Sequence, residues 1–514
     1  MEKTTQGEIN STLWRAADTF RGKIDSSLYK DYILVMLFVK YLSDVYKEHY
    51  DEYAQKYNGD EARIERALGR ERFSLDKKST FDYLYENRNS TEVGDTINKA
   101  LEHIEESNKS KLRGVFRNID FNSQVILGNT KERNDILRTL LIDFNGLDLR
   151  PEHLEGNDVI GDSYEYMIAQ FASDAGKKGG EFFTPSMVSE LLSRLVKPKE
   201  NDRIYDPTCG SGSLLIRAFK KVPNGKAQIY GQERNGQTHS LCKMNMFLHG
   251  IDDAKIANGD TLANPLHLED DKLMKFQVVV ANPPFSLDKW AMGFSGAETE
   301  NSKESDDKKF KMEASLDPYR RFEWGVPPSS KGDFAFVLHM VYSLAEDGRM
   351  GVVLPHGVLF RGASEGKIRK ELLDRNLLDA VIGLPTNLFF GTGIPAAILI
   401  FKKNREKQDV LFIDASGEGH FEKDKNQNKL REEDLKEIEK VYNNYKTIDK
   451  YSYLATLDEI KENDYNLNIP RYVDIFEEEK MVDMDEVAQN INNIKAELQE
   501  VEKEMAKYLD ELGL

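Results

Sequence analysis

The four consecutive residues Asn282, Pro283, Pro284 and Phe285 could do chemistry on an amino group. They follow an apolar run at 276–280 that is typical of a buried strand. Two prolines in a row fix the backbone in an extended form and remove two N–H donors. The Asn282 amide oxygen and the Pro283 carbonyl are then rigid acceptors for both hydrogens of a planar amino group, whose lone pair is freed to attack an electrophile. Phe285 offers a ring on which a flat base rotated out of a duplex can stack.

A second candidate site is the glycine-containing loop at 206–213, which reads Asp206, Pro207, Thr208, Cys209, Gly210, Ser211, Gly212 and Ser213. It lies between a predicted strand and a predicted helix at 214–221. Gly210 and Gly212 allow a ligand to approach the backbone closely, and the start of the helix offers free N–H groups to a carboxylate or phosphate. The loop matches neither the GxGxxG nor the Walker pattern. A tight structural turn is the alternative interpretation.

Two acidic residues favour a ligand at this loop. Glu233 ends the next predicted strand, where a carboxylate can accept hydrogen bonds from ribose hydroxyls, and Asp260 follows the third strand, where it can bind an adenine amino group. Together they predict an adenosine-containing ligand. Asp206 and Pro207 stand in place of a second phosphate-binding glycine, which favours S-adenosylmethionine over a dinucleotide. With this loop opposite it, Asn282–Phe285 is a better candidate site than an ordinary loop.

The elements that must position these residues are strands alternating with helices, which predict a parallel α/β sheet covered on both faces. We expect a hairpin of 381–382 and 396–401 at the sheet edge, and an exposed mobile loop at 295–311. Helices are expected at 159–171 and, capped by Ser186, up to 196. The expected strands are 203–205, 227–230, 255–257, 276–280, 350–354, 378–382 and 398–401.

The segments on either side of this core differ from it. Residues 1–150 have helical periodicity and contain no proline, which predicts a helical domain whose strongest helix starts near Asp31. The core is expected at 151–410, a mixed extension at 411–478 and a long helix at 479–514. That helix has apolar residues with the spacing of a coiled-coil seam, which requires a partner or packing on its own chain. The seam consists of Val487, Ile491, Ile494, Leu498, Val501, Met505, Tyr508 and Leu512.

The composition limits the classes of function. Among 514 residues, 71 are basic and 89 acidic, a net charge of −18 that argues against unaided, non-specific binding of nucleic acid. The only two cysteines, Cys209 and Cys242, fit a reducing cytoplasm and exclude a disulfide framework. No signal peptide or bilayer-spanning segment is visible. We expect no metal site.

These motifs resemble those of the modification (M) subunits of type I restriction–modification systems, which are DNA adenine N6-methyltransferases. The resemblance covers nearly the whole chain. It is carried by 13–14 (LW), 30–34 (KDYIL), 180–185 (GEFFTP), 206–212 (DPTCGSG), 231–233 (GQE), 245–250 (NMFLHG), 282–285 (NPPF), 348–355 (GRMGVVLP) and 384–389 (LPTNLF). It implies a Rossmann-like class I S-adenosylmethionine-dependent methyltransferase core with an N-terminal all-α domain and a C-terminal coiled-coil helix.

The resemblance also implies the ligands and partners. S-adenosylmethionine would be surrounded by Glu181, Phe182, Phe183, Thr184, Pro185 and Ser186, by Ser211 to Ser213, and by Glu233. A separate specificity (S) subunit would read the DNA and hold two M subunits, and a restriction (R) subunit would complete the complex. The terminal helix suits packing on the S subunit. For Arg361, Lys367, Arg369 and Lys370, a solvated helix face is favoured over DNA contact.

Two other functions fit part of the pattern. A related methyltransferase could modify a protein glutamine amide or an RNA base, because the Asn-Pro-Pro-aromatic motif would serve there too. That function leaves the helical N-terminus and the heptad seam unexplained. A non-catalytic scaffold could bind the cofactor as a regulator, but the intact Asn282–Phe285 motif argues against it. Cytosine N4 uses the same chemistry, yet Phe285 and the resemblance favour adenine.

Overall fold

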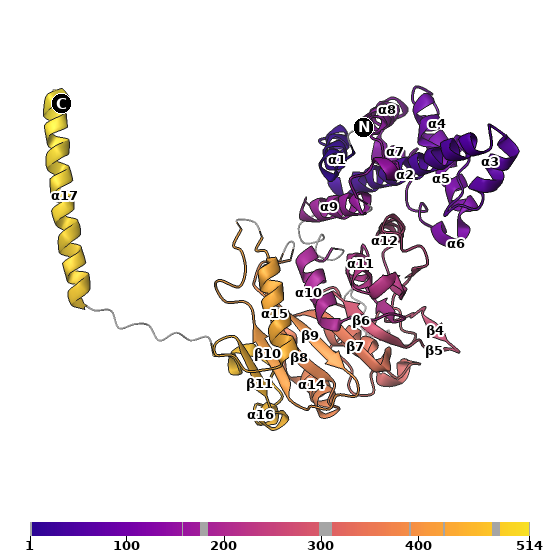
Figure 1. The fold of residues 1–514 in the computed structure, drawn as a ribbon. Coiled ribbons are helices and arrows are strands. Elements are labelled where there is room, and N and C mark those ends of the chain that lie inside the picture. The colour runs from indigo at the N-terminus through magenta and orange to yellow at the C-terminus, as the bar shows by residue number, and fades with distance from the viewer. Residues whose placement is uncertain are drawn as a thin grey trace, which may run out of the picture. The chain divides into compact units, whose positions relative to one another are not determined.

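A nine-stranded mixed sheet forms the centre of the fold (Figure 1). The computed structural model describes residues 3–156, 158–174, 183–297, 311–389, 392–424, 427–474 and 484–512. The strand order is β11-β10-β8-β9-β7-β6-β1-β2-β3. The strands are β1 (Arg203–Asp206), β2 (Gln228–Glu233), β3 (Lys255–Asn258), β6 (Phe276–Ala281), β7 (Leu344–Pro355), β8 (Leu378–Gly383), β9 (Ala396–Lys402), β10 (Val410–Asp414) and β11 (Ser452–Ala455). All seven predicted strands form, and β7 begins six residues earlier than expected.

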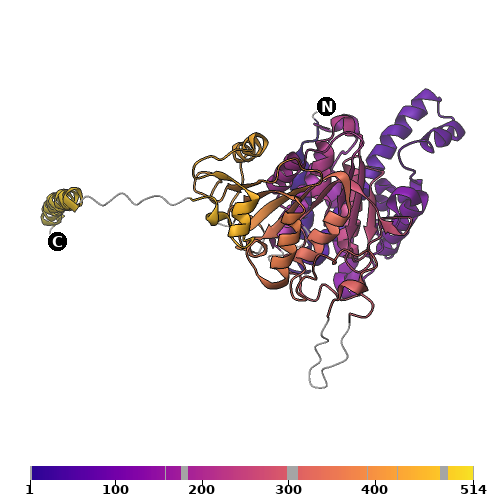
Figure 2. The same ribbon diagram turned by 90° about the horizontal axis from the view of Figure 1, so that it is seen from below.

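The predicted hairpin forms, but it does not lie at the sheet edge. Strand β9 is inserted between β7 and β8 and pairs antiparallel with both, whereas β1, β2, β3, β6 and β7 run parallel. The chain then adds β10 parallel to β8, and β11 antiparallel to β10, beyond the hairpin. The colours of Figures 1 and 2 follow this order, from magenta at β1–β3 to yellow-orange at β10 and β11. A buried apolar run predicts a strand but not its neighbours.

Alternating side chains of the central strands bury both faces of the sheet. On β6, Val278 and Val280 pack with α10 and α11, while Val279 and Ala281 pack with α13 and α14. Apolar residues on consecutive positions are therefore required here, as for any strand covered on both sides. The helices around the sheet are α10 (Ser186–Val196), α11 (Ser213–Lys220), α12 (Gly236–Leu248), α13 (Asp333–Tyr342), α14 (Ala363–Asp374), α15 (Glu432–Asn444) and α16 (Leu457–Glu462).

The N-terminal part of the chain is helical, as predicted. Its longest helix starts at Ser26, earlier than the Asp31 expected from periodicity. Its buried residues form one apolar cluster with α12, in which the rings of Phe38 and Phe247 lie 5.5 Å apart. The helices are α1 (Gln6–Phe20), α2 (Ser26–Lys56), α3 (Glu61–Leu68), α4 (Phe81–Glu86), α5 (Val93–Ser107), α6 (Lys109–Leu112), α7 (Gln124–Leu127), α8 (Thr130–Asn145) and α9 (Val159–Asp174).

Residues 474–514 form a second compact unit, separate from residues 1–473. Its helix α17 (Met484–Leu512) contains the predicted seam. The described seam side chains are between 47% and 64% exposed; they are Ile491, Ile494, Leu498, Val501, Met505 and Tyr508. An apolar stripe exposed along the described part of a helix is typical of a surface that a partner or another part of the chain covers. Across the described segments, no helix has both the length and the apolar content needed to cross a lipid bilayer.

Candidate functional site

The Asn282–Phe285 corner begins directly after β6 and presents a buried acceptor. Asn282 Nδ2 donates a hydrogen bond of 3.1 Å to Thr184 Oγ1, which leaves the amide oxygen on the other side. Asn282 Oδ1 is buried and has no hydrogen-bond partner among the residues that the structure describes. An acceptor of this kind is costly unless a donor binds it. Asn282 therefore carries an oxygen suited to an incoming N–H group.

Two phenylalanine rings contact each other at the end of the corner. The half-buried ring of Phe285 contacts Phe389 edge to face, with 5.7 Å between the ring centroids. Phe389 comes from the segment after β8 and is buried. The contact fixes the plane of the Phe285 ring, so that one aromatic face has a defined direction. Sequence reasoning selected Phe285 but gave Phe389 no role of its own.

The glycine-containing loop is held rigidly between β1 and α11. Gly212 has a φ of +83°, and a Cβ there would lie 2.6 Å from Met246 Cε and 2.8 Å from Cys242 Sγ, so only glycine fits. Asn245, which is fully buried, donates from Nδ2 to the Ser211 carbonyl at 3.0 Å. These contacts hold the loop in this conformation, and its last residue is the first of α11, where backbone N–H groups have no partner within the helix.

Cys209 fills space in this loop. Its Sγ lies 3.8 Å from Cys242 Sγ, and both cysteines are free and buried. The contact with Cys242 and the burial raise the pKa of the Cys209 thiol well above its usual value. A thiol that stays protonated is not a nucleophile, and Cys209 serves here as a small buried side chain that fills space.

Three carboxylates lie at the ends of the first three strands. Asp206 is 2% exposed, and burial, followed by the charge of Glu233, raises its pKa to about 8. Burial also raises the pKa of Glu233, whose two oxygens accept from Gly210 N at 3.0 Å and Asn235 N at 2.7 Å. Asp260 accepts from Leu262 N at 2.9 Å. Acceptor groups of three carboxylates thus lie at the ends of the strands beside the glycine loop.

The loop before α10 contributes Thr184 and the residues next to it. Phe183 is 7% exposed and belongs to the apolar cluster of the N-terminal helices, while Thr184 is 8% exposed. Ser186 is the first residue of α10 and makes no capping bond, since Pro185 is the cap; the predicted Ser186 cap is therefore wrong. Glu181, Phe182 and most of the predicted loop at 295–311 lie outside the described residues.

The four basic residues of α14 and the preceding turn divide into two kinds. Lys367 and Lys370 are exposed, as expected for a solvated face. Arg369 is 4% exposed and donates to the carbonyls of Val358 and Arg361, so the prediction is wrong for this residue. It is also wrong for Arg361, which binds two carboxylates described below. Helical spacing alone did not show that these guanidinium groups are used inside the protein.

A polar cluster and a basic pocket lie away from the corner. On α9, Asp162 and Glu165 face His249 in an arrangement that could hold a metal ion. However, Lys220 and Arg217 already pair with these two carboxylates, so the protein itself supplies the positive charge.

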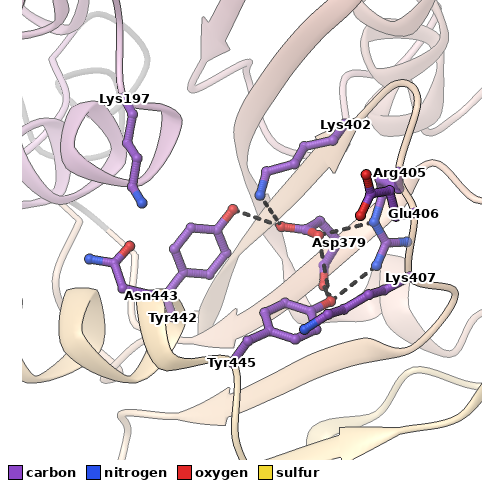
Figure 3. A pocket seen from close by; sticks show the side chains of 9 residues that line it. All are labelled: Lys197, Asp379, Lys402, Arg405, Glu406, Lys407, Tyr442, Asn443 and Tyr445. Atoms are coloured by element: carbon purple, nitrogen blue, oxygen red, sulfur yellow. Dashed lines mark hydrogen bonds and ion pairs between the residues drawn. The ribbon is translucent and has the colours of Figure 1, made fainter.

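The basic pocket has a volume of about 300 Å³ and surrounds Asp379 at the start of β8 (Figure 3). Strand β8 runs in the same direction as β6. The pocket lies at the start of β8, whereas the corner follows the end of β6, so the two are at opposite ends of the strands. Asp379 accepts from Tyr442 Oη at 2.7 Å and Arg405 Nε at 3.0 Å, and forms an ion pair with Lys402 at 2.8 Å. The Asp379 carboxylate is thus bound by residues of the pocket itself, and the pocket serves as a structural junction.

Comparison with known proteins gives the family. The N-6 DNA Methylase model matches residues 155–481, and the HsdM N-terminal domain model matches residues 9–144. The chain belongs to the N-6 DNA methylase family. One relative is the type I restriction enzyme MpnII methylase subunit of Mycoplasma pneumoniae, which is 33% identical over 98% of both chains. Another is the MjaVIII methylase subunit of Methanocaldococcus jannaschii, 34% identical over 100% of this chain and 86% of the relative.

A solved structure has the same fold as this N-6 DNA methylase. It is the type I restriction–modification methyltransferase subunit of Streptococcus thermophilus, with a TM-score of 0.77 and 36% identity over 92% of this chain and 100% of that one. The predicted fold, a class I methyltransferase core with a helical N-terminal part and a C-terminal helix, is confirmed. So is the prediction of an adenine-specific DNA methyltransferase of the type I class, in preference to the protein-glutamine, RNA and scaffold alternatives.

Proposed function

We propose that the Asn282–Phe285 corner binds the adenine whose N6 receives the methyl group. The observation that carries this proposal is the buried Asn282 Oδ1, an acceptor with no partner among the described residues. In this proposal, Oδ1 and the Pro283 carbonyl accept the two N6 hydrogens, and the lone pair of N6 turns toward the methyl donor. Phe285 stacks on the extruded base, which pays part of the cost of unstacking it.

S-adenosylmethionine is the proposed cofactor, and it supplies an electrophilic methyl group. The donor set at the glycine loop fits it. The start of α11 offers backbone N–H groups to its carboxylate, and Glu233 can accept from the ribose hydroxyls. Asp206, buried beside them, can balance a positive charge, and Asp260 can bind the adenine amino group. Phe183 and the residues around it, Glu181 to Ser186, complete the proposed cofactor site with Gly210, Ser211, Gly212 and Ser213.

No strong base is needed at the corner during transfer. When N6 forms its bond to the methyl carbon, the bond from that carbon to the donor sulfur would break, and the sulfur would leave as a neutral thioether. The N6 nitrogen then carries the positive charge, and the two acceptors stabilise it because they hold both of its hydrogens. The proton is then acidic and passes to solvent. The role of the protein's own residues is to fix the amine in one orientation and to exclude competing ones.

The proposed partners are double-stranded DNA, a specificity subunit that holds two copies of this chain, and a restriction subunit. The exposed apolar seam of α17 supports the contact with the specificity subunit, because a helix of that subunit could cover a seam of this kind. The net charge of −18 also supports a division of labour in which another chain supplies most of the grip on DNA. We place the complex in the cytoplasm with its DNA substrate, where the two free thiols stay reduced.

Asn282→Ala tests the proposal. The variant and the wild type are purified with the specificity subunit and given methyl-labelled S-adenosylmethionine and unmethylated duplex DNA. We expect the variant to lose transfer while its affinity for the cofactor stays within about threefold, because Asn282 contacts the base and not the cofactor. Retained turnover would remove Asn282 from the mechanism. A loss of cofactor binding of the same size as the loss of turnover would assign it a different role.

A further inference from the structure

The residue that follows the corner has a backbone conformation that needs support. Ser286 has a φ of +51°, in the left-handed region that side chains with a Cβ seldom adopt. Its backbone N–H donates to Asp333 Oδ1 at 2.8 Å, and its hydroxyl lies 3.4 Å from Asp333 Oδ2. Asp333 is therefore bonded to the main chain one residue beyond Phe285. This contact holds the conformation in which the chain leaves the corner.

Asp333 is itself held by charge. It is the first residue of α13 and is 0% exposed, and the positive end of the helix dipole favours a carboxylate there. Arg361 Nη2 donates to Asp333 Oδ2 at 2.7 Å, and Arg361 Nε donates to Glu365 Oε2 at 2.6 Å. Glu365 is 2% exposed. A buried charge is stable only where neighbouring groups compensate it. Here Arg361 compensates Asp333 and Glu365 through hydrogen bonds of defined geometry.

We infer that Asp333 is a positioning residue for methyl transfer, which fixes the Asn282–Phe285 corner through the Ser286 amide. The inference rests on the proposed role of that corner. Thr184 binds the Asn282 amide at the start of the corner, and Asp333 binds the Ser286 amide at its end. The two prolines make the segment between them stiff, so anchoring both ends fixes the Asn282 oxygen and the Phe285 ring together. Asp333 acts through the backbone and contacts neither base nor cofactor in this inference.

Asp202 offers a matched control. It lies just before β1, at the end of the strands opposite to the Asn282–Phe285 corner. It is 7% exposed, accepts from Lys199 N at 2.8 Å and from Arg349 Nη2 at 2.5 Å, and so makes the same two kinds of bond as Asp333. Asp333→Asn and Asp202→Asn both keep the size of the side chain and remove one buried negative charge. Only the first contacts the corner.

The experiment compares these two variants as full-length chains with the specificity subunit. The measurements are kcat, the KM for unmethylated duplex DNA, the Kd of S-adenosylmethionine and the melting temperature. We expect Asp333→Asn to lower kcat by about 10- to 100-fold, with the cofactor Kd unchanged, because a small displacement of a positioned group has an effect of this size. Asp202→Asn should lower the melting temperature with kcat near wild type. Equal kcat in both variants would overturn the inference.

A second substitution separates positioning from general damage. Ser286→Gly keeps the backbone N–H, and glycine adopts a positive φ without strain. We therefore expect the single Ser286→Gly variant to be active. In the Asp333→Asn background it should recover kcat by roughly fivefold, because the left-handed turn then needs less support. Absence of any recovery would contradict the role of the Ser286 amide.

Two outcomes keep the inference separate from the proposed function. If Asn282→Ala keeps its turnover, the proposed function fails whatever Asp333 does. If Asn282→Ala is inactive and Asp333→Asn is fully active, the inference alone fails.

If Asp333→Asn does not fold, Arg361→Gln is measured instead. This substitution removes the positive charge that pairs with Asp333, and Arg361 lies at a half-buried position. A kcat reduced by about three- to tenfold supports the inference, and a wild-type kcat overturns it.

Discussion

The orientation of the Asn282 amide depends on a single hydroxyl group, and Thr184→Val removes it. Valine has the same branched shape as threonine, and the side chain is 8% exposed, so the substitution changes the hydrogen bond more than the packing. Without the 3.1 Å bond to Oγ1, the amide can rotate and present its NH₂ group to the base. An amide NH₂ group is a donor, so in this orientation Asn282 cannot accept a hydrogen bond from the N6 amino group of the adenine.

The magnitude follows from the kind of bond. A neutral hydrogen bond contributes about 1 kcal/mol net, and a buried donor left without a partner costs about 1–2 kcal/mol. The population of the productive orientation, and with it kcat, should fall by roughly 5- to 30-fold. The Kd of S-adenosylmethionine should change little if Thr184 contributes to the cofactor site only through its backbone.

The assay is steady-state transfer of labelled methyl groups to duplex DNA, with cofactor binding measured separately by calorimetry. Thr184→Ser is the control because it keeps the hydroxyl and loses only the methyl group; it should stay within about twofold of wild type. A Thr184→Val enzyme with wild-type kcat would refute the reasoning. So would a Thr184→Ser enzyme that loses as much as the valine variant, since packing would then explain the effect.

Three further predictions concern other parts of the molecule. Because the pKa of Asp206 is raised to about 8, this carboxyl is mostly protonated at pH 6.5 and charged at pH 9. Affinity for the positively charged cofactor should therefore rise with pH, by up to about tenfold per unit below pH 8, and Asp206→Asn should abolish the trend; calorimetric Kd values that are flat in the wild type would contradict this. Phe285→Ala should raise the KM for DNA by roughly 5- to 100-fold, with Phe285→Tyr near wild type, because stacking on a base contributes about 1–3 kcal/mol; steady-state kinetics with equal KM values would exclude stacking. Deleting residues 487–514 should release the chain from the specificity subunit in light-scattering measurements of mass and leave cofactor binding intact. An unchanged mass of the complex would show that α17 is not the contact.

Local patterns in the sequence were enough to find the elements and the loops that end them. The apolar run of β6 and the proline motif after it are adjacent in the chain, so their relation is visible without a structure. The same holds for Gly212 and the start of α11. Strands β10 and β11 were not predicted, because they become strands by extending a sheet edge that is already formed. The position of β9 between β7 and β8 was likewise not visible, because strand order is a property of tertiary pairing.

The contacts that fix the corner were not predicted because they join distant parts of the chain. Thr184 lies 98 residues before Asn282, and Asp333 lies 47 residues after Ser286. Sequence reasoning placed Thr184 beside the cofactor and did not select Asp333. Neither side chain has a local pattern that reveals its partner, since a threonine before a helix and an aspartate at a helix start both read as ordinary capping residues.

The Thr184 bond has a consequence for how the two substrates are related. Thr184 follows Phe183, which packs in the apolar cluster of the N-terminal helices, and precedes α10, which packs on the sheet. The hydroxyl that orients Asn282 is therefore carried by the segment that connects these two parts of the methylase. Because Thr184 belongs to the proposed cofactor site, a cofactor bound there would hold in place the hydroxyl that already orients Asn282. Base binding should then be tighter with the cofactor bound than without it, and Thr184→Val should weaken that coupling more than it weakens either binding step alone.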